Sequence, residues 1–144
     1  SVFRPKKGLY DYPRASDLLL QAKKHYPDSV ALSTIEEETK QQKKHLMNNL
    51  VSLYNRYINN KQLIKSANGE DLATILPLIK RVDPKHYLLK ESKLADLYLL
   101  ESEILITNRQ YKDARNYIIT GLKLFPNDNR LQNLNTQINA KFIN

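Results

Sequence analysis

The sequence predicts an all-α fold of about six or seven helices, joined by short turns into antiparallel helical hairpins. Apolar residues recur at spacings of three and four along most of the chain, which is the period of an amphipathic helix. Three glycines and six prolines among 144 residues leave little material for a turn-rich all-β fold, and most prolines stand where helical patterns begin or end. With 41% hydrophobic residues the chain can bury one core, so we expect a single domain over residues 10–144.

The first expected helix has about 14 residues and follows a segment, 1–9, that lacks helical periodicity. We expect that segment to be a tail or the end of a truncated element. Pro13 falls in the first turn of the helix, where its fixed φ and missing N–H are tolerated. Pro27 ends the pattern. The inward-facing residues would be Ala15, Leu18, Leu19, Ala22 and Tyr26.

The second expected helix is long. Ser33 and Thr34 followed by Glu36 and Glu37 have the spacing of a capping box, in which hydroxyl and carboxylate satisfy the free amides of a helix start. The apolar stripe then continues to about residue 65, and Gly69 is the expected terminator because glycine adopts left-handed angles without steric cost. The stretch 39–45 is polar all round. Either this part projects into solvent or the helix breaks there.

Two further helices are expected in the middle of the chain. One covers about 70–82, with Leu72, Ile75, Leu76 and Ile79 inward. Pro77 removes one of its hydrogen bonds and should kink it. The other follows Pro84 and covers about 86–107, ending near Asn108.

The last two expected helices belong to an internal repeat. One runs from Tyr111 to Phe125 and stops before Pro126, and a more polar one follows at about 129–142. Residues 12–35 overlay residues 111–134 without a gap. Self-similarity of this kind predicts a repeated helix–turn–helix unit.

The stretch from Ala95 to Asp128 resembles a tetratricopeptide repeat (TPR), a 34-residue pair of antiparallel helices. The residues that match its pattern of large, small and proline positions are Tyr98, Leu105, Tyr111, Ala114, Ile118, Gly121 and Pro126. Small residues at Ala114 and Gly121 would let the first helix of the pair approach closely. Glu101 and Ser102 depart from the family pattern, which usually has Leu and Gly there.

The resemblance implies that the hairpins stack as a short, irregular TPR-like α-solenoid. Its repeat-like units would cover 10–32, 53–86 and 95–128, with a capping helix at 129–142. The prolines that anchor these units are 57 and 42 residues apart rather than 34, and the first unit would retain only its second helix. The alternative is an irregular helical bundle.

The resemblance also implies a partner-binding groove. The residues whose positions line the concave face in proteins of this family are Tyr54, Tyr57, Lys61, Lys65, Asp96, Leu99 and Glu103. Aromatic surface with charges of both signs suits a helical or extended peptide, because aromatic anchors are buried and charges fix the orientation. The alternative is that these residues pack in the core or are solvated.

The sequence shows no arrangement of residues that is typical of a catalytic or metal site. Cysteine is absent, which excludes disulfides, thiolate metal sites and cysteine nucleophiles. The three histidines, His25, His45 and His86, lack a second ligand at helical spacing, and the two beside prolines are expected to interact with helix carbonyls. No glycine-rich phosphate loop or nucleophile elbow appears. We therefore expect no enzyme activity, no metal and no cofactor.

The main functional expectation is a non-catalytic protein–protein interaction module, of a scaffold or regulatory kind, cut from a larger bacterial protein. The net charge of +8 supports an alternative, a basic helical module that binds nucleic acid or an anionic surface. We expect a protein or peptide partner, with a homodimer as a further option. No apolar run is long enough to span a membrane. The lack of cysteine fits the cytoplasm and the periplasm equally.

Overall fold

The computed structural model describes residues 11–142, and this part of the chain contains helices and no strand. The all-α class is therefore confirmed for the described residues. The segment 1–9, expected to be a tail, lies outside them. In chain order the elements are α1 (Tyr12–His25), α2 (Val30–Asn59), α3 (Leu72–Val82), the 3₁₀ turn η2 (Tyr87–Leu89), α4 (Glu91–Thr107), α5 (Tyr111–Leu124) and α6 (Asn129–Ala140).

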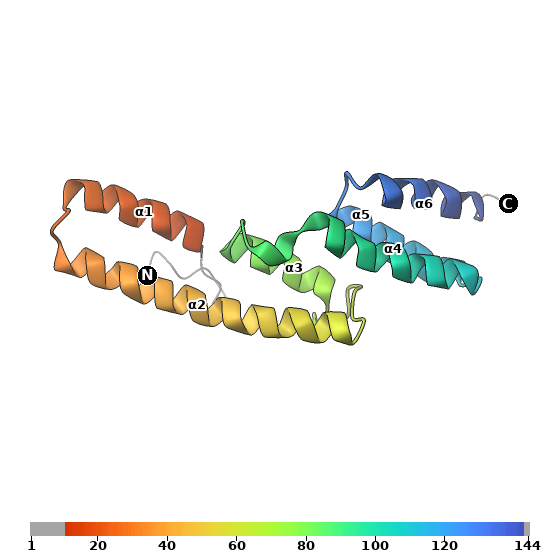
Figure 1. The fold of residues 1–144 in the computed structure, drawn as a ribbon, viewed down its shortest axis with the longest axis horizontal. Helices are drawn as coiled ribbons and strands as arrows, with labels where there is room; N and C mark the ends of the chain where they lie inside the picture. Colours follow the sequence, from red (N-terminus) through yellow and green to blue (C-terminus); the bar gives the residue numbers. More distant parts are fainter. Residues whose placement is uncertain (1–10, 143–144) are drawn as a thin grey trace.

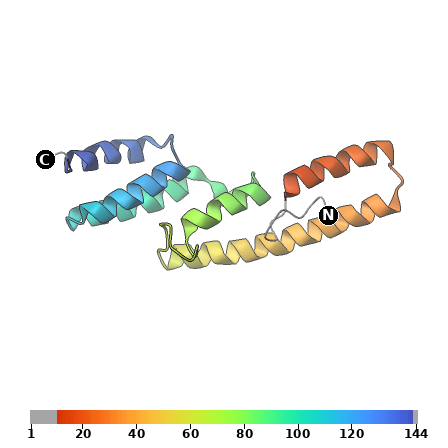
Figure 2. The same ribbon diagram turned by 180° about the vertical axis from the view of Figure 1, so that it is seen from behind.

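The molecule is elongated, and α2 forms one of its long edges (Figure 1). With 30 residues, α2 is about 45 Å long. The helix α1 lies beside the first half of α2 and α3 beside its second half, while α4, α5 and α6 form the opposite end (Figure 2). The helices α4 and α6 run in the same direction, and α5 runs antiparallel to both.

The internal repeat is present in the structure as two matching helix–turn–helix units. The helices α1 and α5 each have 14 residues and start 99 positions apart, and α2 and α6 start at the same offset. In the first turn the Tyr26 amide donates to the Ala22 carbonyl over 2.9 Å. In the second turn the Phe125 amide donates to the Gly121 carbonyl over 2.7 Å. The overlay of residues 12–35 on 111–134 thus reflects a shared local structure.

The helix α1 begins as its sequence predicts. The side chain of Asp11 accepts a hydrogen bond from the Arg14 amide at 3.1 Å, and Pro13 stands in the first turn, where it interrupts no helical hydrogen bond. The inward-facing residues Ala15 and Leu19 are buried, whereas Leu18 is 38% exposed.

The start of α2 differs from the prediction. The helix begins at Val30, and the hydroxyl of Ser29 accepts a hydrogen bond from the Leu32 amide at 3.3 Å. The expected capping box is therefore wrong: Ser33 and Thr34 already lie inside the helix, where the Thr34 hydroxyl donates to the Val30 carbonyl. Helix α2 continues through the polar stretch 39–45 without a break.

The end of α2 also differs from the prediction. The helix stops at Asn59, ten residues before Gly69, because Lys61 adopts a left-handed conformation with φ 53°. The amides of Lys61 and Gln62 donate to the carbonyls of Ile58 and Tyr57 at 3.1 and 2.8 Å, which is the Schellman pattern of a helix end. Gly69 lies in the following loop instead.

The end of α4 repeats this Schellman pattern with another non-glycine residue. Arg109 has φ 61°, and the amides of Arg109 and Gln110 donate to the carbonyls of Ile106 and Leu105. A left-handed conformation costs an L-residue roughly 1–2 kcal/mol, and glycine avoids most of that cost.

We expect Arg109→Gly to raise the free energy of unfolding by about 0.5–1 kcal/mol, because glycine relieves the left-handed strain at the end of α4. Urea denaturation at neutral pH measures the change. Arg109→Ala is the control: it removes the same side chain but keeps the strained backbone, so it should not stabilise the protein. Equal gains from both variants would contradict this explanation.

The loop between α2 and α3 is held by buried polar groups. Asp71 is fully buried and accepts hydrogen bonds from the Thr74 amide at 2.7 Å, from the Ser66 amide at 2.8 Å and from the Ser66 hydroxyl at 3.1 Å. From α4, the Tyr98 hydroxyl donates to the Leu63 carbonyl at 2.7 Å. Burial raises the pKa of Tyr98 well above its usual value, so the hydroxyl stays protonated as a donor.

The helix α3 packs the face that its sequence predicts. Its buried residues are Leu72, Ile75, Leu76, Ile79 and Val82. The helix runs through Pro77, which lies on the exposed side. Because that side faces away from the core, the proline ring does not disturb the apolar contacts.

The predicted helix 86–107 is divided in two. Residues Tyr87–Leu89 form η2, and α4 begins only at Glu91, after Lys90 in an extended conformation. The Nδ1 atom of His86 accepts a hydrogen bond from the Leu88 amide at 3.2 Å. The expected contact of His86 with helix carbonyls is therefore wrong, since this histidine caps the start of a 3₁₀ turn.

The helices α4, α5 and α6 pack tightly around Gly121. A Cβ atom at this position would lie 3.0 Å from the Cβ of Tyr98 on α4 and 3.0 Å from a methyl group of Leu131 on α6. Tyr98, Leu131 and Ala114 are buried. The close approach that the sequence predicts at Gly121 is thus present, and it lies between α5 and both of its neighbours.

Candidate functional site

The two tyrosines expected in the groove lie in the core. Tyr54 and Tyr57 are only 9% and 5% exposed and belong to the larger core cluster, most of whose residues come from α2, α3 and the start of α4. Burial raises the pKa of Tyr54. Little of either side chain is available to a partner, which agrees with the alternative that these residues pack.

The two predicted lysines lie in the loop after α2. Lys61 forms an ion pair with Glu101 of α4 across 3.8 Å, and Lys65 is exposed. The pairing partner Glu101 was noticed in the sequence only as a departure from the TPR pattern. Glu101 connects the loop to α4. The sequence showed that this residue is unusual for the family, but it did not predict the ion pair with Lys61.

Three predicted residues, Asp96, Leu99 and Glu103, share the face of α4 that is turned toward α6. Asp96 forms an ion pair with Arg130 of α6, and Arg130 also binds Asp128 at 3.0 Å. The hydrogen bond from Arg130 lowers the pKa of Asp128, with smaller help from the Leu131 amide. Leu99 is half-buried and Glu103 is exposed. The structure therefore brings this part of the predicted set together along one helix.

A hollow of about 440 Å³ lies between α4 and α6, nearer to the C-terminal ends of both helices than the ion pair between Asp96 and Arg130. We call it the α4–α6 groove, and its lining residues are Glu103, Ile106, Thr107, Leu134, Gln137, Ile138 and Lys141. Ile106 and Leu134 are half-buried, while the charged Glu103 and Lys141 are exposed. Apolar floor and charges of both signs are the composition expected of a peptide-binding groove.

The C-terminal side of this groove is held by contacts between cations and aromatic rings. The Lys141 ammonium lies 5.6 Å from the ring centroid of Tyr111 on α5. The Arg115 guanidinium lies 5.0 Å from the ring centroid of Phe142. Such contacts are worth about 0.5–1 kcal/mol at exposed sites, so they help to keep the end of α6 against α5.

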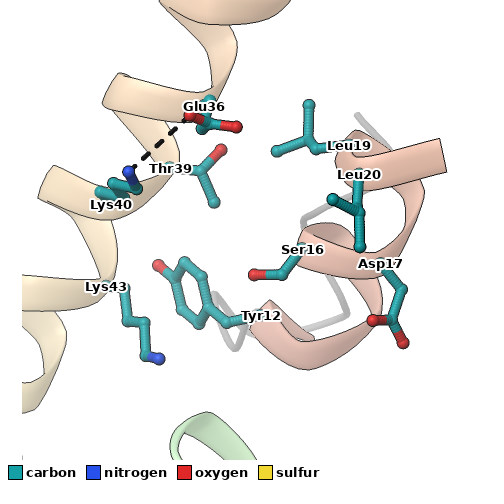
Figure 3. A pocket seen from close by; sticks show the side chains of 9 residues that line it. All are labelled: Tyr12, Ser16, Asp17, Leu19, Leu20, Glu36, Thr39, Lys40 and Lys43. Atoms are coloured by element: carbon teal, nitrogen blue, oxygen red, sulfur yellow. Dashed lines mark ion pairs between the residues drawn. The ribbon is translucent and has the colours of Figure 1, made fainter. Parts of the chain in front are cut away.

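A second hollow, of about 430 Å³, separates α1 from α2 (Figure 3). Tyr12 and Ser16 of α1 point toward α2, where Thr39 and Lys43 face them. The Thr39 hydroxyl is already used, because it donates to the Ile35 carbonyl at 2.7 Å. The lining is mixed, with Leu19 and Leu20 beside charged side chains, and the Glu36 carboxylate there pairs with the Lys40 ammonium at 3.7 Å.

Within residues 11–142 no three His, Cys, Asp or Glu side chains are close enough to hold a metal ion together. In the same range no helix has the length and apolar character needed to cross a membrane.

Comparison of the chain with protein-family models, curated proteins and solved structures found no match. The sequence reasoning missed three polar residues with structural roles: Asp71, Glu101 and Arg130. Asp71 carried a usable signal, since an Asp directly before an apolar helical pattern is a common N-cap. Arg130 carried none, because its ion pair joins residues 34 positions apart.

Proposed function

We propose that this chain is a non-catalytic protein-interaction module that binds a peptide segment of its partner in the α4–α6 groove. The observation that carries the proposal is the groove itself: about 440 Å³ of open space with an apolar floor between two helices and a charge at each side. Glu103, one of the residues expected to line a binding groove, contributes its acidic side chain there.

The packing of α4, α5 and α6 supports a TPR-like unit in this part of the chain. Gly121 lies where a side chain would collide with both Tyr98 and Leu131, as a close helix pair followed by a third helix requires. In such a unit the first helix of the pair, here α4, and the helix that follows the pair, here α6, would line the inner surface. The parallel course of α4 and α6 agrees with that arrangement (Figure 1).

The ion pairs around Arg130 support binding because they fix α6 relative to α4 before a partner arrives. Arg130 binds Asp96 of α4 and Asp128 at the start of α6, and it also donates to the Ser92 carbonyl at 3.4 Å. A preformed groove loses less conformational entropy on binding than a flexible one.

The lining predicts the kind of peptide. Ile106 and Leu134 offer apolar contact to one aliphatic or aromatic side chain, and Glu103 favours a basic residue beside it. Lys141, on the other side, favours an acidic residue. We therefore propose a peptide with an apolar anchor between charges of opposite sign.

A displayed library of random peptides, selected against the folded chain, tests this function. We expect enriched peptides to share the apolar anchor, and Glu103→Lys to weaken their binding by at least about tenfold, because it replaces attraction with repulsion. Asp17→Lys, the same change of charge on the distant α1, is the matched control and should leave the affinity unchanged. Failure to enrich any peptide, or equal affinities for both variants, would refute the proposal.

A further inference from the structure

The turn between α1 and α2 exposes large apolar side chains beside acidic ones. Tyr26 is 69% exposed and Val30 is 78% exposed. Beside Val30 lies a shallow hollow with Asp28, Glu37 and Glu38 in its lining. We call these five residues the hairpin tip.

The internal repeat indicates that the Tyr26 position is one that this fold buries. Its counterpart, Phe125, is 7% exposed, and its ring centroid lies 6.4 Å from that of Tyr98 on α4. Within residues 11–142 no helix covers Tyr26 in the way that α4 covers Phe125. Large apolar side chains left exposed together are typical of interaction sites.

A surface of opposite charge lies where α3, the start of α4 and the end of α5 meet. It contains a hollow of about 340 Å³, which we call the basic hollow. Its lining residues are Leu76, Pro77, Lys80, Pro84, Leu89, Leu94, Lys123, Leu124 and Phe125. This volume lies at the lower end of the range in which proteins hold small organic molecules, so it can receive one aromatic side chain.

Among the described residues, the cations of the basic hollow have no acidic partner. Lys80 and Lys123 are exposed, and neither forms an ion pair with another described residue. The chain from residue 80 to residue 93 carries five Lys or Arg against two Asp or Glu. Tyr87, 67% exposed, adds apolar surface in the same segment.

We propose that the hairpin tip of one molecule docks into the basic hollow of a second copy of this chain. Tyr26 enters the apolar hollow, and the carboxylates of the tip face Lys80 and Lys123. The two surfaces differ, so the contact is head-to-tail, and a pair of molecules joined by one such contact keeps one free tip and one free hollow. Association therefore continues beyond a dimer as concentration rises. The contact leaves the α4–α6 groove free and stands apart from the proposed peptide binding.

A second copy fits these surfaces better than a nucleic acid does. Phosphate groups would pair with the two lysines but would make no favourable contact with the apolar lining between these lysines. Binding of phosphates would also not account for the exposed Tyr26 and Val30. A protein side chain uses both the apolar lining and the lysines. Charge complementarity of this kind directs association and makes it sensitive to salt.

Sedimentation velocity at low salt over a wide concentration range tests the contact. We expect the wild-type chain to form species larger than a dimer. Tyr26→Ser removes the anchor of the tip, and Lys80→Glu with Lys123→Glu reverses the charge of the hollow, so each should weaken association by at least about tenfold. All of these residues are exposed, so folding is expected to be unchanged, which circular dichroism checks. Leu100→Ser, which removes another exposed apolar side chain from α4, is the matched control and should associate as the wild type does.

Mixing the two variants gives the sharpest result. The Tyr26→Ser chain keeps an intact hollow and the Lys80→Glu, Lys123→Glu chain keeps an intact tip, so their mixture should form a complex that stops at two chains. Wild type that stays monomeric at every concentration would overturn the proposal, even if the basic hollow bound mixed-sequence RNA at low salt. Variants that associate as the wild type does would also overturn it.

Discussion

Replacing Asp71 with alanine is expected to lower the free energy of unfolding by about 3 kcal/mol. The substitution removes the N-cap of α3, which is worth about 0.5–2 kcal/mol, and leaves the amides of Ser66 and Thr74 without the buried carboxylate that accepts their hydrogen bonds. Urea denaturation at pH 7 measures the loss. Asp11→Ala is the control, because Asp11 caps α1 with one hydrogen bond in a half-buried setting, and about 1 kcal/mol is expected there.

The contribution of Asp71 should also depend on pH. Burial raises the pKa of this carboxyl, but hydrogen bonds from Ser66 and Thr74 outweigh burial, and the net pKa is lowered. The folded-state pKa therefore lies below the unfolded value of about 3.9. The resulting stabilisation is complete above that value and is lost as the pH falls through it toward the folded-state pKa. The difference in stability between wild type and Asp71→Asn should shrink between pH 6 and pH 2, and a constant difference would contradict this assignment.

Replacing Gly121 with leucine is expected to destabilise the chain by about 2–3 kcal/mol. Even a Cβ would lie 3.0 Å from Tyr98 and Leu131, so the larger side chain must push α4 or α6 away from α5. The gain in helix propensity over glycine, about 0.8 kcal/mol, offsets only part of this cost. Thermal unfolding followed by circular dichroism measures the effect.

The internal repeat supplies the control for this substitution. Ala22 is the counterpart of Gly121 on α1, but it is only half-buried. We expect Ala22→Leu to cost less than about 1 kcal/mol. If both substitutions lowered the stability equally, the close packing around Gly121 would not be the cause of the destabilisation by Gly121→Leu.

The helices that could be predicted from the sequence are those whose signals are local. Pro13, Pro27 and Pro126 mark the bounds of α1 and α5, and the overlay of the two copies predicted the same turn in each. The start of α2 was misplaced because Ser29 and the Ser33–Thr34 pair are both acceptable caps. Its end was misplaced because Lys61 takes the left-handed conformation that glycine usually adopts. The end was therefore predicted at Gly69, the next glycine in the sequence.

The candidate site could be predicted only where one helix carries it. The resemblance to a tetratricopeptide repeat implied that Asp96, Leu99 and Glu103 share one face of a single helix, and the structure has them on one face of α4. Tyr54 and Tyr57 also share a face of α2, but spacing cannot tell whether that face meets solvent or α3. The α4–α6 groove depends on contacts between segments about 30 positions apart, and these have no local signal.

The measurement that tests peptide binding most directly is the mapping of amide chemical shifts in the isotope-labelled chain on addition of a selected peptide. Binding in the α4–α6 groove predicts that the largest shifts fall on the residues around Glu103, Ile106, Leu134 and Gln137. Residues of α1 and the first half of α2 should stay unchanged. Shifts confined to the hairpin tip or the basic hollow, or spread evenly over the chain, would contradict the account.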